Sequence, residues 1–98
     1  MKNWYHHLDK AFENKVRLGI MSLLMIESAV DFNTLKEALE ITDGNLASHL
    51  KNLEKLAYIE VKKEFVGRKP RTSYQATKTG KVAFQQHIKA LEKFLGDQ

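Results

Sequence analysis

The chain has 98 residues, 43% hydrophobic and 29% charged, which is the composition of one globular domain (residues 1–98) with a single modest core. It contains no cysteine, which excludes disulfide bonds, thiolate metal sites and thiol redox switches. Its apolar runs are far shorter than the roughly 20 residues of a membrane span, and its first ten residues do not resemble a signal peptide. We therefore expect a cytoplasmic protein that does not bind membranes.

The formal net charge of +4 is unevenly distributed along the chain. Residues 45–81 hold nine Lys and Arg against three Glu and carry +6, whereas the other residues together carry −2. A basic segment in an otherwise acidic chain is typical of proteins that bind a polyanion.

The N-terminal residues 1–10 contain Trp4 and Tyr5 but too few apolar residues in period for a core helix. Aromatic side chains near a terminus usually pack against another surface, and we expect a second subunit to provide it. Neighbouring His6 and His7 would point apart on a helix, which disfavours metal binding by this pair.

Two helices are predicted next. Apolar residues at helical spacing indicate a helix over Val16–Glu27 that ends at Ser28–Asp31. Arg17, near its start, could contact a phosphate, although an ordinary solvated side chain is the expected role. Asn33 is the expected N-cap of a shorter second helix that runs to Glu40.

A third helix is predicted over Asp43–Ala57, after a tight link at Ile41-Thr42, with Thr42 or Asp43 as its N-cap. Its inward face is apolar and consists of Leu46, Leu50, Leu53 and Ala57. Its outward face consists of Gly44, Ser48, Lys51, Asn52 and Lys55, with Asn45 and His49 on the flank. Such a helix can pack on its own core and still present hydrogen-bonding groups to a groove.

A β-hairpin with a basic turn is predicted after the third helix. Apolar and charged residues alternate over Ile59–Phe65, the period of a half-buried strand, and Thr72–Ala76 forms a second short run. Gly67 and Pro70 mark the turn between them. The turn holds three cations, Arg68, Lys69 and Arg71. Like charges repel and a hairpin needs no such cluster to fold, so the cluster indicates an anionic partner.

A final helix, capped by Thr77, is predicted over Lys78–Leu95. It carries two adjacent apolar stripes, namely Phe84, Ile88, Leu91 and Leu95 beside Ala83, His87, Ala90 and Phe94. One stripe is enough to pack on a small domain, so the second predicts contact with a second copy of the chain. The expected homodimer interface contains Trp4, Tyr5, Phe84, His87, Ile88, Leu91, Phe94 and Leu95.

Catalytic motifs are absent from the sequence. It has no phosphate-binding glycine loop, no H-E-x-x-H and no serine in a nucleophile elbow, and its acidic residues are scattered. We therefore expect neither an enzyme nor a bound cofactor.

The order of helix, turn, helix and basic hairpin resembles the winged helix-turn-helix DNA-binding domain. The stretches TDGNLASHLKNLE from Thr42, YIEV from Tyr58 and GRKPRTSYQATKTGK from Gly67 resemble small single-domain regulators related to the MarR and ArsR groups. The resemblance covers about Ala11 to Leu95. It implies a mostly helical α+β fold with a three-helix core, a two-stranded wing and a C-terminal helix. The sequence departs from the pattern at Ala57, where a helix-ending glycine is usual.

The resemblance implies a homodimeric transcriptional regulator, more often a repressor, that binds double-stranded DNA at a roughly palindromic operator. The third helix would enter the major groove, and the hairpin at about residues 59–76 would lie on the minor groove or the backbone. Asn45, Ser48 and Asn52 carry groups able to read base edges, and Gly44 would allow close approach of the backbone. Phosphate contacts are expected from His49, Lys51, Lys55, Thr72, Ser73 and Lys78, and minor-groove contacts from Arg68, Lys69 and Arg71.

Two alternatives remain open at this point. A winged helix can serve as a protein-interaction module, although its outward helix would then carry apolar anchors rather than Asn, Ser and Lys. A metal-responsive regulator would use His6, His7, Asp9 and His87. The sequence identifies neither an effector nor an operator.

Overall fold

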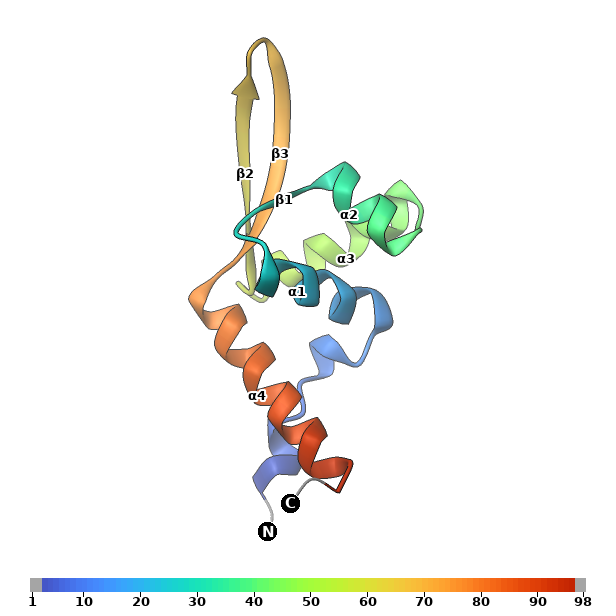
Figure 1. Ribbon diagram of the computed structural model, residues 1–98, viewed down its shortest axis with the longest axis vertical. Helices are drawn as coiled ribbons and strands as arrows, with labels where there is room; N and C mark the ends of the chain where they lie inside the picture. The colour runs from blue at the N-terminus through green and yellow to red at the C-terminus, as the bar shows by residue number, and fades with distance from the viewer. Residues whose placement is uncertain (1–2, 97–98) are drawn as a thin grey trace.

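Helices precede and follow a small antiparallel sheet in the computed structural model, which describes residues 3–96 (Figure 1). In chain order the elements are the 3-10 helices η1 (Asn3–His7) and η2 (Lys10–Phe12), then α1 (Lys15–Ile26), β1 (Val30–Asp31), α2 (Phe32–Leu39), α3 (Asp43–Lys55), β2 (Ile59–Val66), β3 (Lys69–Ala76) and α4 (Lys78–Phe94). The mostly helical α+β fold, the three central helices, the hairpin and the C-terminal helix were all predicted and are confirmed. None of the helices within residues 3–96 is both long and apolar enough to cross a membrane.

The core lies between α1, α2, α3 and the base of the sheet. The predicted inward face of α3 is confirmed for Leu46, Leu50 and Leu53, which are almost fully buried. Phe12 of η2 completes this core, because its ring stacks on Tyr58 at 5.5 Å and meets Phe84 edge-on at 5.2 Å between centroids. The N-terminal segment therefore packs on its own domain.

The start of α2 differs from the prediction. Asp31, rather than Asn33, is the N-cap, and its Oδ1 accepts the Thr34 N–H at 2.8 Å. Asp31 also belongs to β1, a two-residue strand that pairs with β3 and makes the sheet three-stranded in the order β1-β3-β2. A strand of two residues has no periodicity, so it could not be predicted from the sequence.

The exit from α3 is a left-handed turn at Ala57, which has a φ of 62°. The N–H groups of Ala57 and Tyr58 donate to the carbonyls of Glu54 and Leu53 at 2.9 and 3.0 Å, which is a Schellman arrangement. The helix ends at Lys55, so the predicted end was two residues too far. Ala57 is exposed and does not belong to the buried face.

The wing, formed by β2 and β3, is longer and its turn tighter than predicted. Only Gly67 and Arg68 lie between the strands, and Phe65 pairs with Pro70 inside the ladder. Proline has no backbone N–H to donate. Because β1 does not extend as far as Pro70, no carbonyl group of a neighbouring strand loses a hydrogen bond there. The wing projects beyond the helices (Figure 1), and of β2 only Ile59 is buried. The prediction of a half-buried strand was therefore wrong for its outer residues, and Phe65 is 74% exposed.

Helix α4 runs away from the wing beside η1 (Figure 1). Thr77 is its N-cap, as predicted, and accepts the Gly80 N–H at 2.9 Å. Phe84 and His87 are buried within one chain, because the N-terminal segment covers them and the Asp9 N–H donates to His87 Nδ1 at 2.9 Å. These two residues were expected to contact a second subunit, and intramolecular packing accounts for them instead. The side chain of Trp4 lies outside what the structure describes.

Candidate nucleic-acid interface

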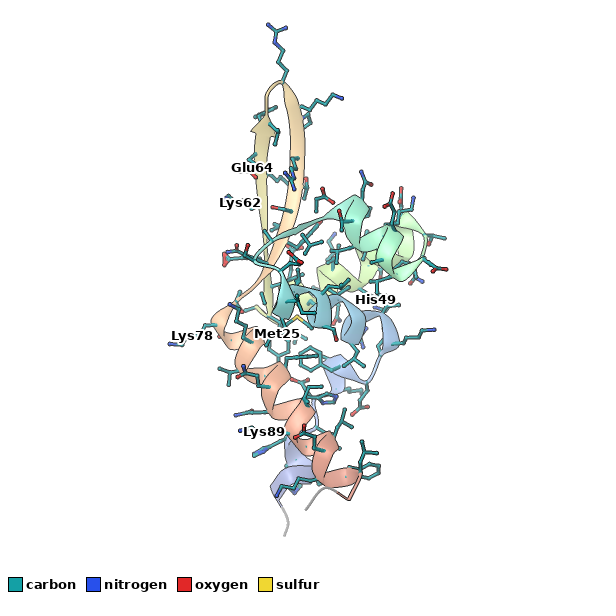
Figure 2. The ribbon with its side chains drawn as sticks, in the orientation of Figure 1. Met25, His49, Lys62, Glu64, Lys78 and Lys89 are labelled. Atoms are coloured by element: carbon teal, nitrogen blue, oxygen red, sulfur yellow. The ribbon has the colours of Figure 1, made fainter. Side chains whose placement is uncertain are left out.

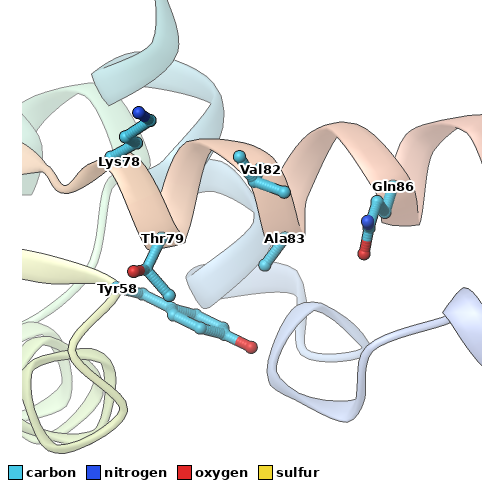
Figure 3. Close-up of a pocket in the computed structure, with 6 residues that line it drawn as sticks. All are labelled: Tyr58, Lys78, Thr79, Val82, Ala83 and Gln86. Atoms are coloured by element: carbon cyan, nitrogen blue, oxygen red, sulfur yellow. The ribbon is translucent and has the colours of Figure 1, made fainter.

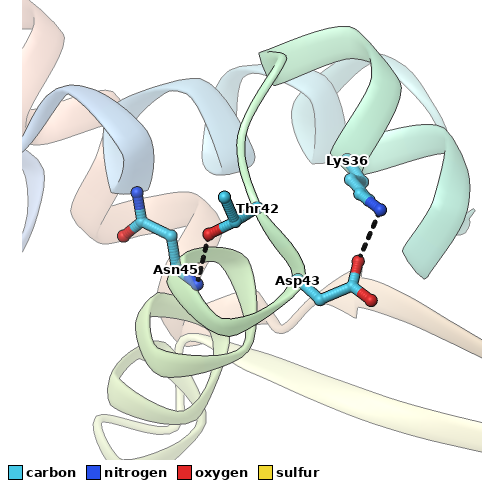
Figure 4. Close-up of polar contacts among 4 residues, drawn as sticks. All are labelled: Lys36, Thr42, Asp43 and Asn45. Atoms are coloured by element: carbon cyan, nitrogen blue, oxygen red, sulfur yellow. Dashed lines mark hydrogen bonds and ion pairs between the residues drawn. The ribbon is translucent and has the colours of Figure 1, made fainter.

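A three-residue link joins α2 to α3 and orients the second helix outward. Glu40 is left-handed, with a φ of 53°, and Thr42 Oγ1 accepts the Asn45 N–H at 3.2 Å (Figure 4). Lys36 Nζ lies 2.7 Å from Asp43 Oδ1 across the turn (Figure 4). Such an exposed ion pair contributes only about 0–1 kcal/mol. It does balance the one carboxylate at the N-terminus of α3, where an anionic partner would otherwise be repelled.

The outward face of α3 is polar and accessible, as the sequence predicted. The exposed residues on it are Gly44, Asn45, Ser48, Lys51, Asn52 and Lys55. Gly44 has no atom within 4 Å of the position that a Cβ would occupy, so another molecule can approach the backbone there. These residues form one continuous surface with hydrogen-bonding groups and two cations.

The flank of α3 holds a contact that the sequence did not predict. Arg17 is half-buried rather than freely solvated, and its Nε donates to the Ala11 carbonyl at 2.7 Å. A second guanidinium nitrogen lies 3.0 Å from Nδ1 of His49, which is also half-buried. Burial is the larger cause, and the charge of Arg17 the smaller one, of a pKa of His49 that lies below its ordinary value. Arg17 also lines a hollow of about 300 Å³ between the N-terminal segment and Asn52.

The cations of the wing fall into two environments. Arg68 and Lys69 are exposed at the tip. Arg71 lies two residues further along β3, with a guanidinium nitrogen 3.7 Å from Asp31 Oδ2. Hydrogen bonds from Thr34 and, more weakly, the charge of Arg71 lower the pKa of Asp31. Only two of the three predicted cations therefore lie at the tip. The third, Arg71, lies further along the strand and is partly balanced by a carboxylate.

The remaining predicted contacts are Thr72, Ser73 and Lys78. Ser73 is only 4% exposed, so it does not present its hydroxyl in the way Ser48 does, and Thr72 is half-buried. Lys78 lies at the base of α4, on the opposite side of the molecule from His49 (Figure 2). It borders a shallow hollow of about 400 Å³ between α4 and the Tyr58 ring (Figure 3).

A metal site was the basis of one alternative. Within residues 3–96, no three His, Asp or Glu side chains are grouped so that they could hold a metal ion. His87 Nδ1 already accepts a backbone N–H, and the Asp9 carboxylate accepts the Tyr58 hydroxyl at 2.6 Å. The four residues named for that alternative therefore do not form a site.

A short helix, a tight turn, a second helix with an exposed polar face and a hairpin with a cationic tip together define a winged helix DNA-binding domain. The chain belongs to the winged helix DNA-binding domain family, whose model matches residues 16–95.

Known proteins agree with this assignment. A protein of Methanocaldococcus jannaschii, itself uncharacterised, is 42% identical over 79 residues, or 81% of this chain and 86% of that protein. The solved structure of a transcriptional regulator homologue from Pyrococcus horikoshii OT3 matches with a TM-score of 0.87 at 28% identity, over 98% of this chain and 96% of that one. A structure from Enterococcus faecalis V583 assigned to the MarR family matches with a TM-score of 0.75 at 23% identity, over 88% and 76% of the two chains. The family match and these structures agree on a winged helix DNA-binding domain, and the structure from the MarR family shares its fold.

Proposed function

We propose that the chain represses transcription as a homodimer bound to a roughly palindromic DNA operator. The observation that carries the proposal is that the polar face of α3 and the cationic tip of the wing are both exposed on one domain. In a winged helix these are the elements that contact the two kinds of groove.

The proposed reading face of α3 lies in the major groove. Asn45, Ser48 and Asn52 each carry both hydrogen-bond donor and acceptor atoms, which is the chemistry needed to distinguish base edges. Lys51 and Lys55 would neutralise phosphates, which position a protein without specifying a sequence. Exposure of all five side chains supports this division.

The proposed contact of the wing is the flanking minor groove or backbone, through Arg68 and Lys69. Arg71 has a weaker role in this scheme than the sequence implied, because Asp31 is within 3.7 Å. Arginine in a narrow minor groove benefits from the strongly negative potential there.

The proposed dimer contact is the outer end of α4. Phe94 and Leu95 are exposed apolar residues at this end, and Val82 is exposed near the start of the helix, although one chain already buries its Phe84 and His87. A groove of about 540 Å³ runs along α4, and its apolar lining residues are Met25, Phe84 and Ile88. Met25 and Lys89, both labelled in Figure 2, line this groove together. An apolar surface on so small a domain is most simply covered by a second copy.

Selection of bound sequences from random duplex DNA tests the proposal. We expect a motif with two-fold symmetry and a sedimenting species of about twice 11.3 kDa. Asn52→Ala should relax preference at one base pair by about 1–3 kcal/mol, whereas Lys51→Ala should weaken all sequences alike. Failure to enrich any motif, with no DNA binding at low salt, would leave a protein-interaction module as the better explanation.

A further inference from the structure

The guanidinium of Arg17 connects three segments that are distant in sequence. Its Nε donates to the Ala11 carbonyl of η2 at 2.7 Å, and another of its nitrogens lies 3.0 Å from Nδ1 of His49 on α3. Arg17 itself belongs to α1. An arginine has five N–H donors and no acceptor, so the contact is a hydrogen bond only if His49 Nδ1 is the acceptor.

This contact determines which imidazole nitrogen of His49 carries the proton. A neutral histidine with an accepting Nδ1 must carry its single proton on Nε2. The partial burial of His49 and the neighbouring positive charge favour the same neutral form, because both lower the pKa of the ring. The Nε2–H is then a neutral donor.

His49 is well placed for this donor to be used. It follows Asn45 by four residues and precedes Asn52 by three, so the three side chains share one flank of α3. Asn45 and Asn52 are exposed, whereas His49 is half-buried nearer the core. A donor at the edge of a helix that enters a groove meets the DNA backbone rather than the base edges.

We propose that Arg17 is a positioning residue for DNA binding, which holds His49 as the Nε2–H tautomer so that it donates to a phosphate oxygen. The inference rests on the proposed function, because it requires α3 to lie in the major groove. Arg17 acts through His49 in this scheme, and not as a direct contact.

The first test needs no DNA. In protein labelled with ¹⁵N at histidine, at about pH 7.5, the His49 ring should show a protonated Nε2 and an unprotonated Nδ1. Arg17→Met keeps the aliphatic stem but removes the donor, and should give a mixture of tautomers and a raised His49 pKa. A wild-type ring protonated on Nδ1, or a spectrum unchanged by Arg17→Met, overturns the proposal.

The second test is a double-mutant cycle on DNA affinity. Arg17→Met should weaken binding roughly 3- to 10-fold, as expected for one lost hydrogen bond, but have almost no effect in a His49→Asn background. His49→Gln, whose amide nitrogen can occupy the place of Nε2, should retain most of the affinity, whereas His49→Asn should not. Arg17→Lys should also lose affinity, because lysine keeps the charge but cannot place two N–H donors in the fixed geometry of a guanidinium.

Lys15→Met is the matched control, since it removes an exposed cation two residues earlier on the same helix. It should cost less affinity than Arg17→Met and combine additively with His49→Asn. Equal losses for the two variants, with full additivity in both cycles, would show that Arg17 acts only through its charge. A loss confined to one base pair would contradict the phosphate assignment. Absence of DNA binding by the wild type overturns the proposed function as well, whereas the other outcomes leave that function standing.

Discussion

Gly80→Ala is the substitution for which the structure gives the sharpest expectation. A Cβ at this position would lie 2.1 Å from the Tyr58 carbonyl oxygen, whereas carbon and oxygen normally stay about 3.3 Å apart. Either α4 or the segment around Tyr58, between α3 and β2, must therefore move by about 1 Å. The same carbonyl accepts the Thr77 N–H at 3.0 Å, so the movement also strains the start of α4.

The expected loss of stability follows from these contacts. Overpacking costs about 1–3 kcal/mol, and a weakened hydrogen bond costs about 1 kcal/mol more. Alanine offsets roughly 0.5–1 kcal/mol of this, because glycine is the poorer helix former. The net destabilisation of about 1–3 kcal/mol corresponds to a fall in Tm of about 5–20 °C in a domain of this size.

Thermal unfolding followed by circular dichroism measures this loss, at one fixed protein concentration. Gly44→Ala is the control, because a Cβ there meets nothing within 4 Å. That variant should be stabilised by about 0.5–1 kcal/mol, and should bind DNA more weakly if the backbone at Gly44 approaches the groove. A Gly80→Ala protein as stable as the wild type would show that α4 does not lie against Tyr58.

Two further predictions concern stability. Ala57→Gly should stabilise the fold by about 0.5–1 kcal/mol in urea titrations, because Ala57 has a φ of 62° and the strain there exceeds the entropy cost of glycine; a loss of stability would contradict the left-handed exit from α3. Burial lowers the pKa of His87 below its ordinary 6.5, although Asp9 and Glu13 oppose the shift. As the pH falls, His87 is therefore protonated at a higher pH in the unfolded chain than in the folded one. The contribution of His87 to the free energy of unfolding should be complete above about pH 6.5 and should decrease below that pH. His87→Asn keeps an acceptor for the Asp9 N–H without titrating and should flatten this dependence in acid unfolding, although His49 leaves a residual slope of the same sign.

The sequence predicted the elements that carry a long period or a strong end signal. Leu46, Leu50 and Leu53 define the buried face of α3, and the hydroxyls of Thr42 and Thr77 cap the helices that follow them. Features shorter than one period were missed. β1 is such a case, because its two residues are strand only through pairing with β3.

Contacts between distant residues had no local signal. Asp9 and His87 are 78 positions apart, and Arg17 and His49 are 32 apart, so nothing in the pattern of either stretch indicates that they meet. The wing shows the same limit. Pro70 favoured a wide turn in the sequence, and only its place beyond the end of β1 makes it acceptable inside a strand. The double stripe on α4 predicted a helix covered on two sides by a second copy, but the N-terminal segment of the same chain covers Phe84 and His87, and Phe94 and Leu95 are exposed.

Binding of duplex DNA by α3 and the wing together can be measured by a salt titration of affinity for a selected duplex. The wild type is compared with Arg68→Ala/Lys69→Ala, and Arg71→Ala is the matched control. The tip residues bury no core, so the fold should be unchanged. If each tip cation neutralises one phosphate, the slope of log affinity against log salt should fall in magnitude by about 2 per subunit, or about 4 for a dimer. Arg71→Ala should reduce the slope by less, because Asp31 already balances part of that charge. An unchanged slope and unchanged affinity in the tip variant would show that the wing does not contact DNA.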